Sequence, residues 1–143
     1  KEEVPEEYYT TEIGKANVVS TGDDLTIITY GLGVHWAVQE MKNRPDIQAE
    51  IIDLRSLVPL DTETIYTSVK KTGRAIVLHE DCISGGIGGE LTALITEHCF
   101  EFLDAPVLRV GSLNSPVPFA ATIEAIFLPQ DRFTKAVDQL LNY

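Results

Sequence analysis

The residues best suited to acid–base chemistry are His79, Glu80 and Asp81, which follow a short apolar run at residues 74–78. This run has the length and composition of a buried parallel strand, so the three polar side chains stand at its carboxyl end. A histidine titrates near neutrality and a neighbouring carboxylate can orient its ring, so the cluster could transfer protons. The sequence places no serine, cysteine or second histidine to complete a catalytic triad. We therefore favour a polar strand end that caps backbone groups or contacts another subunit.

A glycine-rich loop at residues 84–89 follows this cluster and leads into a predicted helix over residues 87–102, whose apolar residues recur at helical spacing. Glycines before a helix could cradle a phosphate, but the loop matches neither G-x-G-x-x-G nor a P-loop. We favour a tight turn that lets the helix pack on the sheet. Ligands and partners dock at such loops, at the carboxyl ends of parallel strands. The interface candidates of this region are His79, Glu80, Asp81, Ser84, Gly85 and Gly86.

Trp36 is a further interface candidate, because it lies in the first turn of a predicted helix beside the same loops. Packing against the sheet is the alternative for this side chain. The two cysteines, Cys82 in the loop and Cys99 on the apolar helix face, are expected to be free thiols. No spacing of cysteine and histidine resembles a zinc site.

The 143 residues include 22 acidic and 11 basic side chains, which gives a net charge of −11. Nucleic-acid binding requires the opposite sign, so we exclude it. The acidic excess serves solubility or forms a docking surface for a basic partner. No apolar run has the roughly 20 residues of a membrane span, and no signal peptide is visible.

Strand and helix patterns alternate along the chain. The expected strands cover residues 17–20, 25–30, 49–54, 74–78 and 107–110. The expected helices begin near residues 34, 60, 87 and 130, and residues 111–121, with Pro116 and Pro118, are expected to form a loop. This order predicts right-handed βαβ crossovers and a mostly parallel sheet covered by helices on both faces.

The segment from Leu60 to Gly73 is the best-delimited helix. Asp61 is its expected N-cap, Leu60 and Ile65 have the spacing of a hydrophobic staple, and Gly73 supplies a left-handed stop. The residues expected in the core of the domain are Leu60, Ile65, Val69, Ile76, Val77, Leu91, Leu94, Ile95, Val137 and Leu140.

Residues 1–15 are acidic and show neither a helical nor a strand period, which is typical of a linker. The sequence also lacks an initiating methionine. We expect residues 1–15 to be a linker from a missing upstream domain and residues 16–143 to be one domain.

Several strings in the sequence resemble the C-terminal part of the β subunit of 2-oxo-acid dehydrogenase E1 components, which are thiamine-diphosphate-dependent enzymes related to transketolase. These strings are VPEEYYTTEIGKANVV, TIITYGLGVHWA, IIDLRSLVPLDTETIYTSVKKTGR, VLHEDCISGGIGGEL and FLDAPVLRVGSLNSPVPFA. The resemblance implies a transketolase C-terminal fold: a three-layer α/β/α domain with a mostly parallel five-stranded sheet and one antiparallel edge strand. The strings at His79-Glu80, His98–Phe100 and Leu141–Tyr143 are more similar to branched-chain (2-oxoisovalerate) enzymes than to pyruvate enzymes.

The resemblance also implies what the full enzyme contains. Thiamine diphosphate and magnesium are held by other domains of the α and β subunits, so we expect no catalytic, cofactor-binding or metal-binding residue in this fragment and no cofactor bound to it. The family assigns to this domain contacts with the E1 α subunit, with a second β subunit and with the small, basic peripheral subunit-binding domain of E2. The docking candidates are Asp131, Asp138 and Tyr143 of the terminal helix.

Alternatives remain at this stage. The same domain occurs in pyruvate and acetoin dehydrogenases, in transketolases and in deoxyxylulose-phosphate synthases. A stand-alone α/β module that binds a small ligand is the non-enzyme alternative. The resemblance favours a bacterial cytoplasmic location, or the mitochondrial matrix for a eukaryotic source.

Overall fold

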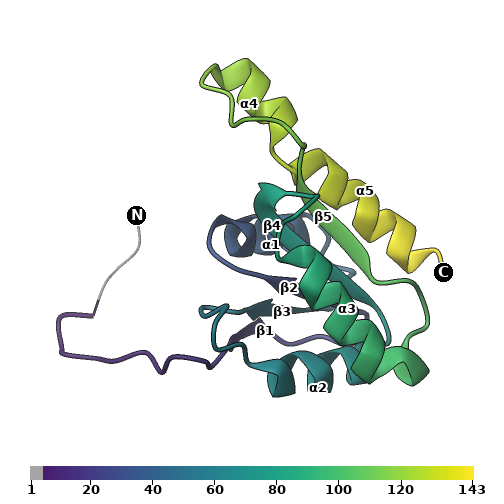
Figure 1. Cartoon of the computed structure of the whole chain (residues 1–143). Helices are drawn as coiled ribbons and strands as arrows, with labels where there is room; N and C mark the ends of the chain where they lie inside the picture. The colour runs from purple at the N-terminus through teal and green to yellow at the C-terminus, as the bar shows by residue number, and fades with distance from the viewer. Residues whose placement is uncertain (1–4) are drawn as a thin grey trace.

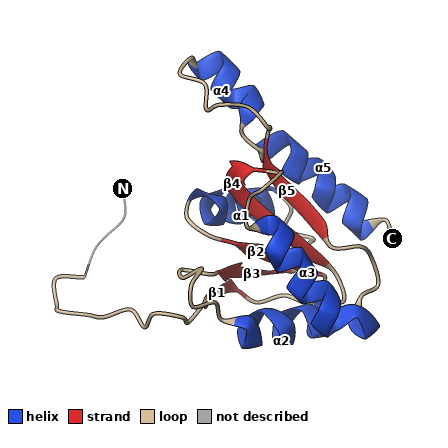
Figure 2. Ribbon diagram, in the orientation of Figure 1, coloured by secondary structure: helices blue, strands red, loops and turns tan. Residues whose placement is uncertain are grey.

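Five short strands rich in β-branched and aliphatic residues form one sheet between two layers of helices (Figures 1 and 2). The computed structural model describes residues 5–143. The strands are β1 (Asn17–Ser20), β2 (Leu25–Thr29), β3 (Ala49–Asp53), β4 (Ala75–Cys82) and β5 (Leu108–Ser112). Their spatial order is β1-β3-β2-β4-β5, with β1 antiparallel to β3 and the other neighbours parallel. The expected three-layer fold with one antiparallel edge strand is confirmed.

The helices divide between the two faces of the sheet. They are α1 (Leu32–Asn43), α2 (Thr62–Thr72), α3 (Gly88–Cys99) with the short 3₁₀ turn Phe100–Phe102, α4 (Ala121–Phe127) and α5 (Gln130–Leu141). The core on one face joins α1 and α5 to the sheet, and the core on the other face joins α2 and α3 to it. Neighbouring residues of β2 show this division, because Ile27 belongs to the first core and Ile28 to the second.

The helix α2 begins and ends as its sequence predicts. The Asp61 side chain accepts a hydrogen bond from the Thr64 backbone N–H at 3.2 Å. Gly73 ends the helix in the left-handed region, with φ of 69°. Most of the expected core is buried as well, but Leu60 and Leu94 are only half-buried. Leu94 lies at the border of the inner face of α3, which is defined by Leu91, Ile95 and Cys99.

Two elements differ from the prediction. β4 does not end at Leu78 but continues through His79 to Cys82, because its polar end still pairs with β5, where Cys82 lies opposite Ser112. The expected loop at 111–121 begins as the end of β5, and the helix α4 follows it. Figure 1 shows α4 projecting from the end of the sandwich.

Residues 5–15 form neither helix nor strand, as expected for a linker. The expected linker also includes residues 1–4, which lie outside the described residues. The division into a linker and a domain stays a prediction.

Candidate functional site

The strand order reverses between β2 and β4. After β2 the chain passes through α1 to β3 on one side, and after β4 it passes through α3 to β5 on the other. The carboxyl ends of β2 and β4 therefore frame a topological switch point, which is where open α/β sheets bind ligands. Tyr30 follows β2 there, while Glu80 and Asp81 lie near the end of β4.

These three side chains form an electronegative cluster. Partial burial raises the pKa of the Tyr30 hydroxyl, and the negative charges of Asp81 and Glu80 raise it further. Both carboxylates are exposed. The predicted interface candidates Glu80 and Asp81 thus lie where a partner can reach them, and the partner that they favour is cationic.

His79 is not exposed at the predicted interface. Its side chain is fully buried, so the prediction of a direct partner contact is wrong for this residue. The ring occupies the space that side chains at Gly86, Gly88 and Gly111 would need: a Cβ at these positions would lie 2.8, 2.4 and 2.9 Å from ring atoms. Burial lowers the pKa of the imidazole. His79 is therefore the residue over which the glycine loop closes, which agrees with a packing role for that loop.

The rest of the loop is accessible. Ser84 and Gly85 are exposed, and Gly86 is half-buried. Asn114 accepts a hydrogen bond from the Ser84 backbone N–H at 3.0 Å, and its own amide lies 2.8 Å from the Ser84 hydroxyl. The structure therefore brings Glu80, Asp81, Ser84 and Gly85 to one exposed edge, and the segment after β5 holds this edge in place.

Trp36 is a second correction. Its side chain is only 8% exposed and belongs to the core that α1 and α5 form with the sheet. Residues Trp36 and Ala37 form the inner side of α1, whereas Leu32 and His35 are exposed. Trp36 therefore packs against the sheet and does not provide an exposed interface.

The three docking candidates on the terminal helix do not form one surface. Asp131 lies in the first turn of α5 and Tyr143 just after its end, so the 12 residues of the helix separate them by about 18 Å. Asp138 forms an ion pair with Arg44, which holds the pKa of that carboxyl below its usual range. Arg44 also pairs with Glu40 at 2.8 Å, so Asp138 links α5 to the end of α1.

Tyr143 instead lines a groove that the sequence did not reveal. This C-terminal groove has a volume of about 640 Å³ and is lined by Thr92, Thr96, Phe100, residues 103–107 and Tyr143. Asp104 contributes a carboxylate to it, and Glu97 and Glu101 line the adjoining hollow, which shares Phe100. The exposed aromatic residues in Phe100-Glu101-Phe102 were the available sequence signal.

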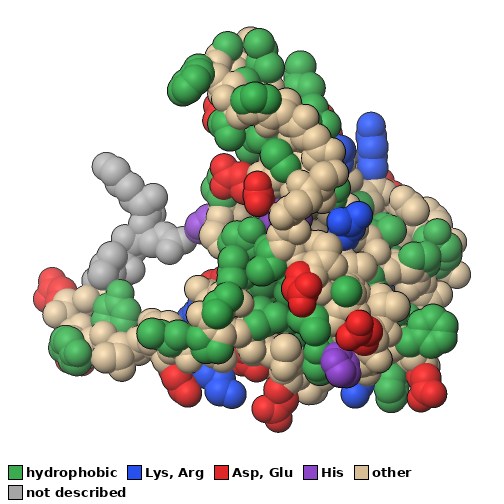
Figure 3. Space-filling view, in the orientation of Figure 1, with side chains coloured by type: hydrophobic (Ala, Val, Ile, Leu, Met, Phe, Trp, Pro, Cys, Tyr) green, Lys and Arg blue, Asp and Glu red, His purple; other side chains and the backbone are tan. Residues whose placement is uncertain are grey.

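A second exposed surface was also missed. The α4 arm, residues 113–127, is apolar on its outer side, and Figure 3 shows hydrophobic side chains gathered over it. Phe119 is fully exposed, and Ile126 is 67% exposed. The large apolar side chains that the arm exposes are Leu113, Val117, Phe119, Ile123 and Ile126. Exposed apolar surfaces of this kind are typical of protein–protein interfaces.

Within residues 5–143, no group of three or more His, Cys, Asp and Glu side chains could hold a metal ion. No helix in this described part is both long and apolar enough to cross a membrane. Cys82 and Cys99 are free thiols, as expected.

Comparisons with known proteins identify relatives of the whole chain. A family model described as "Transketolase, C-terminal domain" matches residues 14–132. The 2-oxoisovalerate dehydrogenase subunit beta of Bacillus subtilis (strain 168) is 42% identical over 147 residues, which cover 100% of this chain and 45% of that protein. The pyruvate dehydrogenase E1 component subunit beta of the same organism is 44% identical over 134 residues, which cover 92% of this chain and 41% of that protein.

A solved structure described as "Split gene transketolase, inactive beta4 tetramer" has a TM-score of 0.77 and 27% sequence identity. The match covers 97% of this chain and 46% of that chain. This chain therefore spans less than half the length of each of these relatives.

Proposed function

Since this chain belongs to the transketolase C-terminal domain family, we propose that it is the C-terminal assembly and docking domain of a 2-oxo-acid dehydrogenase E1 β subunit. The observation that carries the proposal is the identity of 42% and 44% to two such β subunits over nearly the whole chain. The full enzyme would decarboxylate a 2-oxo acid oxidatively and pass the acyl group to the lipoyl arm of E2.

For the substrate we propose 2-oxoisovalerate. Two observations support this substrate. The B. subtilis 2-oxoisovalerate dehydrogenase subunit beta aligns with all of this chain. The strings at His79-Glu80, His98–Phe100 and Leu141–Tyr143 are similar to those of branched-chain enzymes. The similar identity to a pyruvate dehydrogenase subunit means that the choice rests on these strings. Pyruvate and acetoin dehydrogenases are the alternatives within the family.

The cofactors of the proposed enzyme are thiamine diphosphate and magnesium. Within residues 5–143 no group of three or more His, Cys, Asp and Glu side chains could hold a metal ion, and this chain covers only 45% of its 2-oxoisovalerate dehydrogenase relative. We therefore propose that other domains of the enzyme hold both groups. The contribution of this chain is assembly with the α subunit and a second β subunit, and docking of E2.

We place E2 docking at the C-terminal groove. Its apolar floor can receive aliphatic side chains, and the carboxylates of Asp104 in the groove and Glu101 in the adjoining hollow suit a small basic domain. Asp131 lies too far along α5 to share this contact, and the charge of Asp138 is already paired with Arg44. The exposed α4 arm and the Glu80–Gly85 edge are the candidate contacts with other E1 subunits.

A chimeric β subunit tests the proposal. This chain replaces the corresponding C-terminal part of the B. subtilis 2-oxoisovalerate dehydrogenase subunit beta, and the product is expressed with its α subunit. We expect the chimera to assemble and to oxidise 2-oxoisovalerate with an artificial electron acceptor, which needs no E2. Failure of a folded chimera to assemble with the α subunit would contradict the assembly role.

The docking role is tested separately in the same chimera. Removal of Asn142 and Tyr143, or the pair Glu101→Gln and Asp104→Asn, should lower the E2-coupled rate and leave the artificial-acceptor rate unchanged. The matched control Asp131→Asn should change neither rate. Binding of the E2 domain should also weaken as salt rises, mainly through slower association. Unchanged E2 coupling in both groove variants would place docking elsewhere.

A further inference from the structure

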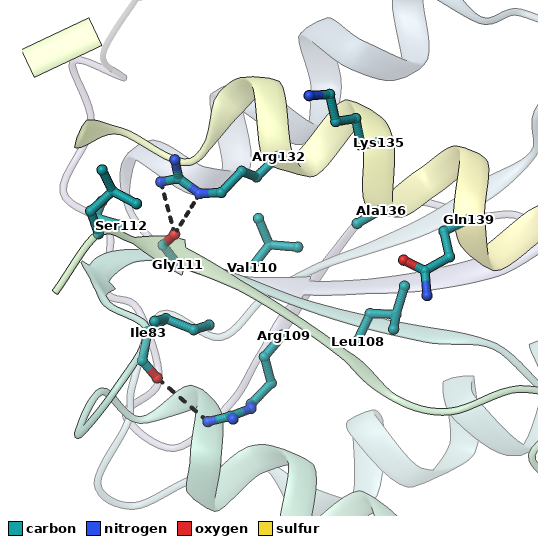
Figure 4. Close-up of a pocket in the computed structure, with 11 residues that line it drawn as sticks. Ile83, Leu108, Arg109, Val110, Gly111, Ser112, Arg132, Lys135, Ala136 and Gln139 are labelled. Atoms are coloured by element: carbon teal, nitrogen blue, oxygen red, sulfur yellow. Dashed lines mark hydrogen bonds between the residues drawn. The ribbon is translucent and has the colours of Figure 1, made fainter. Parts of the chain in front are cut away.

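A second groove lies beside β5, between this edge strand and α5 (Figure 4). This β5 groove is lined by Ile83, residues 108–113, Arg132, Lys135, Ala136 and Gln139. Its volume of about 310 Å³ is at the lower end of the range for small-molecule sites. Leu108, Val110 and Ala136 make much of its wall apolar, so it suits a ligand with an aliphatic or aromatic body.

The charge of the β5 groove is opposite to that of the molecule. Its lining contains the cations Arg109, Arg132 and Lys135 and no carboxylate, although acidic residues outnumber basic ones by 22 to 11 in the chain. Within the described part of the chain, the ion pairs under 4 Å use the cations Arg44 and Lys71. The three cations of the groove therefore keep a local positive charge that no carboxylate neutralises at contact distance.

Arg132 gives this groove a fixed wall. Its guanidinium donates to the carbonyl oxygens of Gly111 at 3.1 Å, Phe127 at 2.7 Å and Leu128 at 3.1 Å. The Gly111 carbonyl is thereby occupied, and the backbone from Val110 to Ser112 is buried. Addition of a peptide strand along this edge is consequently disfavoured, and a small molecule fits the observations better.

Lys135 and Arg109 remain available for a ligand. Lys135 is exposed, and none of the hydrogen bonds or ion pairs found among residues 5–143 involves its ammonium group. Arg109 is exposed and makes one long hydrogen bond, 3.4 Å, to the Ile83 carbonyl. Figure 4 shows these two cationic side chains on either side of β5, with Leu108 and Val110 between them.

We propose that the β5 groove binds a small amphipathic anion, a carboxylate or phosphate carried on a short apolar body. The anionic head is held by a charge-assisted hydrogen bond from Lys135, and the positive charges of Arg132 on the same helix and of Arg109 across β5 favour it further. The apolar body lies against Leu108, Val110 and Ala136. Neither the thiamine cofactor nor E2 docking is involved, so this site is independent of the proposed function.

The test is an amide NMR titration of the 143-residue chain with hexanoate, hexyl phosphate and hexylamine at equal ionic strength. Both anions should shift the amides of residues 108–113 and 132–139, and hexylamine should not. A preference between the anions then identifies the head group. Lys135→Glu should weaken binding by about tenfold, as expected for one lost hydrogen bond to a charged group. The matched control Lys42→Glu changes the net charge equally and should leave binding unchanged.

Three results would overturn the proposal. Equal weakening by Lys42→Glu would mean that only the overall charge matters. Equal shifts with hexylamine would mean that the groove does not select anions. Binding of an acidic peptide, such as residues 5–13 of this chain, without binding of either hexyl anion would make the groove a protein contact. Because Lys42 and Lys135 are both exposed, the variants should fold, which the same spectra check.

Discussion

His79 is fully buried, yet neither of its ring nitrogens has a hydrogen-bond partner among the described residues. An unsatisfied buried polar group costs about 1–3 kcal/mol. Close contact with Gly86, Gly88 and Gly111 offsets part of that cost, because the ring fills the space that those glycines leave. A residue type suited to proton transfer thus serves mainly to shape a loop.

The burial of His79 predicts a pH dependence of stability. Its folded-state pKa is lowered by burial, an effect that the nearby Asp81 carboxylate opposes more weakly, so the unfolded chain binds the proton more readily. Stability should fall by up to about 1.4 kcal/mol for each pH unit below roughly 6.5. Denaturant unfolding at pH 7.5 and 5.5 measures this. His79→Gln should reduce the dependence, while the exposed control His98→Gln should leave it unchanged.

Substitution by alanine should have opposite effects on stability at two neighbouring glycines, Gly88 and Gly89. A Cβ at Gly88 would lie 2.4 Å from the His79 Nε2 atom, whereas a Cβ at Gly89 would meet only the Arg109 guanidinium at 3.5 Å. Gly88→Ala should therefore destabilise the fold by about 1–3 kcal/mol. Gly89→Ala should stabilise it by up to about 1 kcal/mol, because alanine favours the helix. Equal thermal melting temperatures for the two variants would contradict this account of the loop.

The sequence predicted best those elements whose ends carry local signals. The start and end of α2 follow from Asp61 and Gly73, which act within one helical turn. The helix α4 was missed because Pro116 and Pro118 precede it, it has only seven residues, and only Phe127 is buried. The extension of β4 was missed because its last residues are polar and their pairing with β5 is a long-range contact.

The cap of α2 also connects that helix to the first strand. Asp61 accepts hydrogen bonds from the Ala16 backbone N–H at 3.0 Å and from the Thr64 hydroxyl at 2.9 Å. Burial would raise the pKa of Asp61, but these bonds and that of the Thr64 N–H outweigh burial and lower it. Asp61→Ala should cost about 2 kcal/mol at pH 7 by denaturant unfolding, whereas Glu63→Ala, an exposed acid of the same turn, should cost little. The difference should begin to shrink as the pH falls below about 4, the pKa of an unfolded aspartate, and should be lost only at lower pH, where the folded-state carboxyl of Asp61 is also protonated.

At the scale of the whole molecule, the alternation of strands and helices predicted the layers but not which helix side faces inward. Trp36 was assigned to an exposed interface, because its position in the first turn of α1 does not show which side of that helix faces the sheet. The C-terminal groove and the α4 arm were unpredictable for a related reason: each combines segments that only the folded chain brings together.

In the proposed E1 assembly, the α4 arm should control the association of the subunits. In a chimeric β subunit, Ile126→Asp places a charge on the exposed apolar side and should shift the assembled enzyme towards smaller species in sedimentation. The stability of the isolated chain should change by less than about 0.5 kcal/mol, because the site is exposed. Val58→Asp, an equivalent change at an 89% exposed loop residue, is the control. Unchanged sedimentation of the Ile126 variant would remove the arm from the interface.

Asn114 bonds the start of the arm to Ser84, whereas the other end of the arm is attached to the sandwich largely through a single side chain. Arg132 donates hydrogen bonds to Gly111 of β5 and to Ile126, Phe127 and Leu128 at the end of α4. The arm is therefore expected to open as a separate cooperative unit, with its own hydrogen-exchange rate. In Arg132→Gln the amides of residues 121–128 should exchange at least about tenfold faster while those of β2 and β4 keep their protection. Lys135→Gln, one turn later on α5, should leave both sets unchanged. Faster exchange of α4 alone means that the arm opens to solvent while the sheet stays closed.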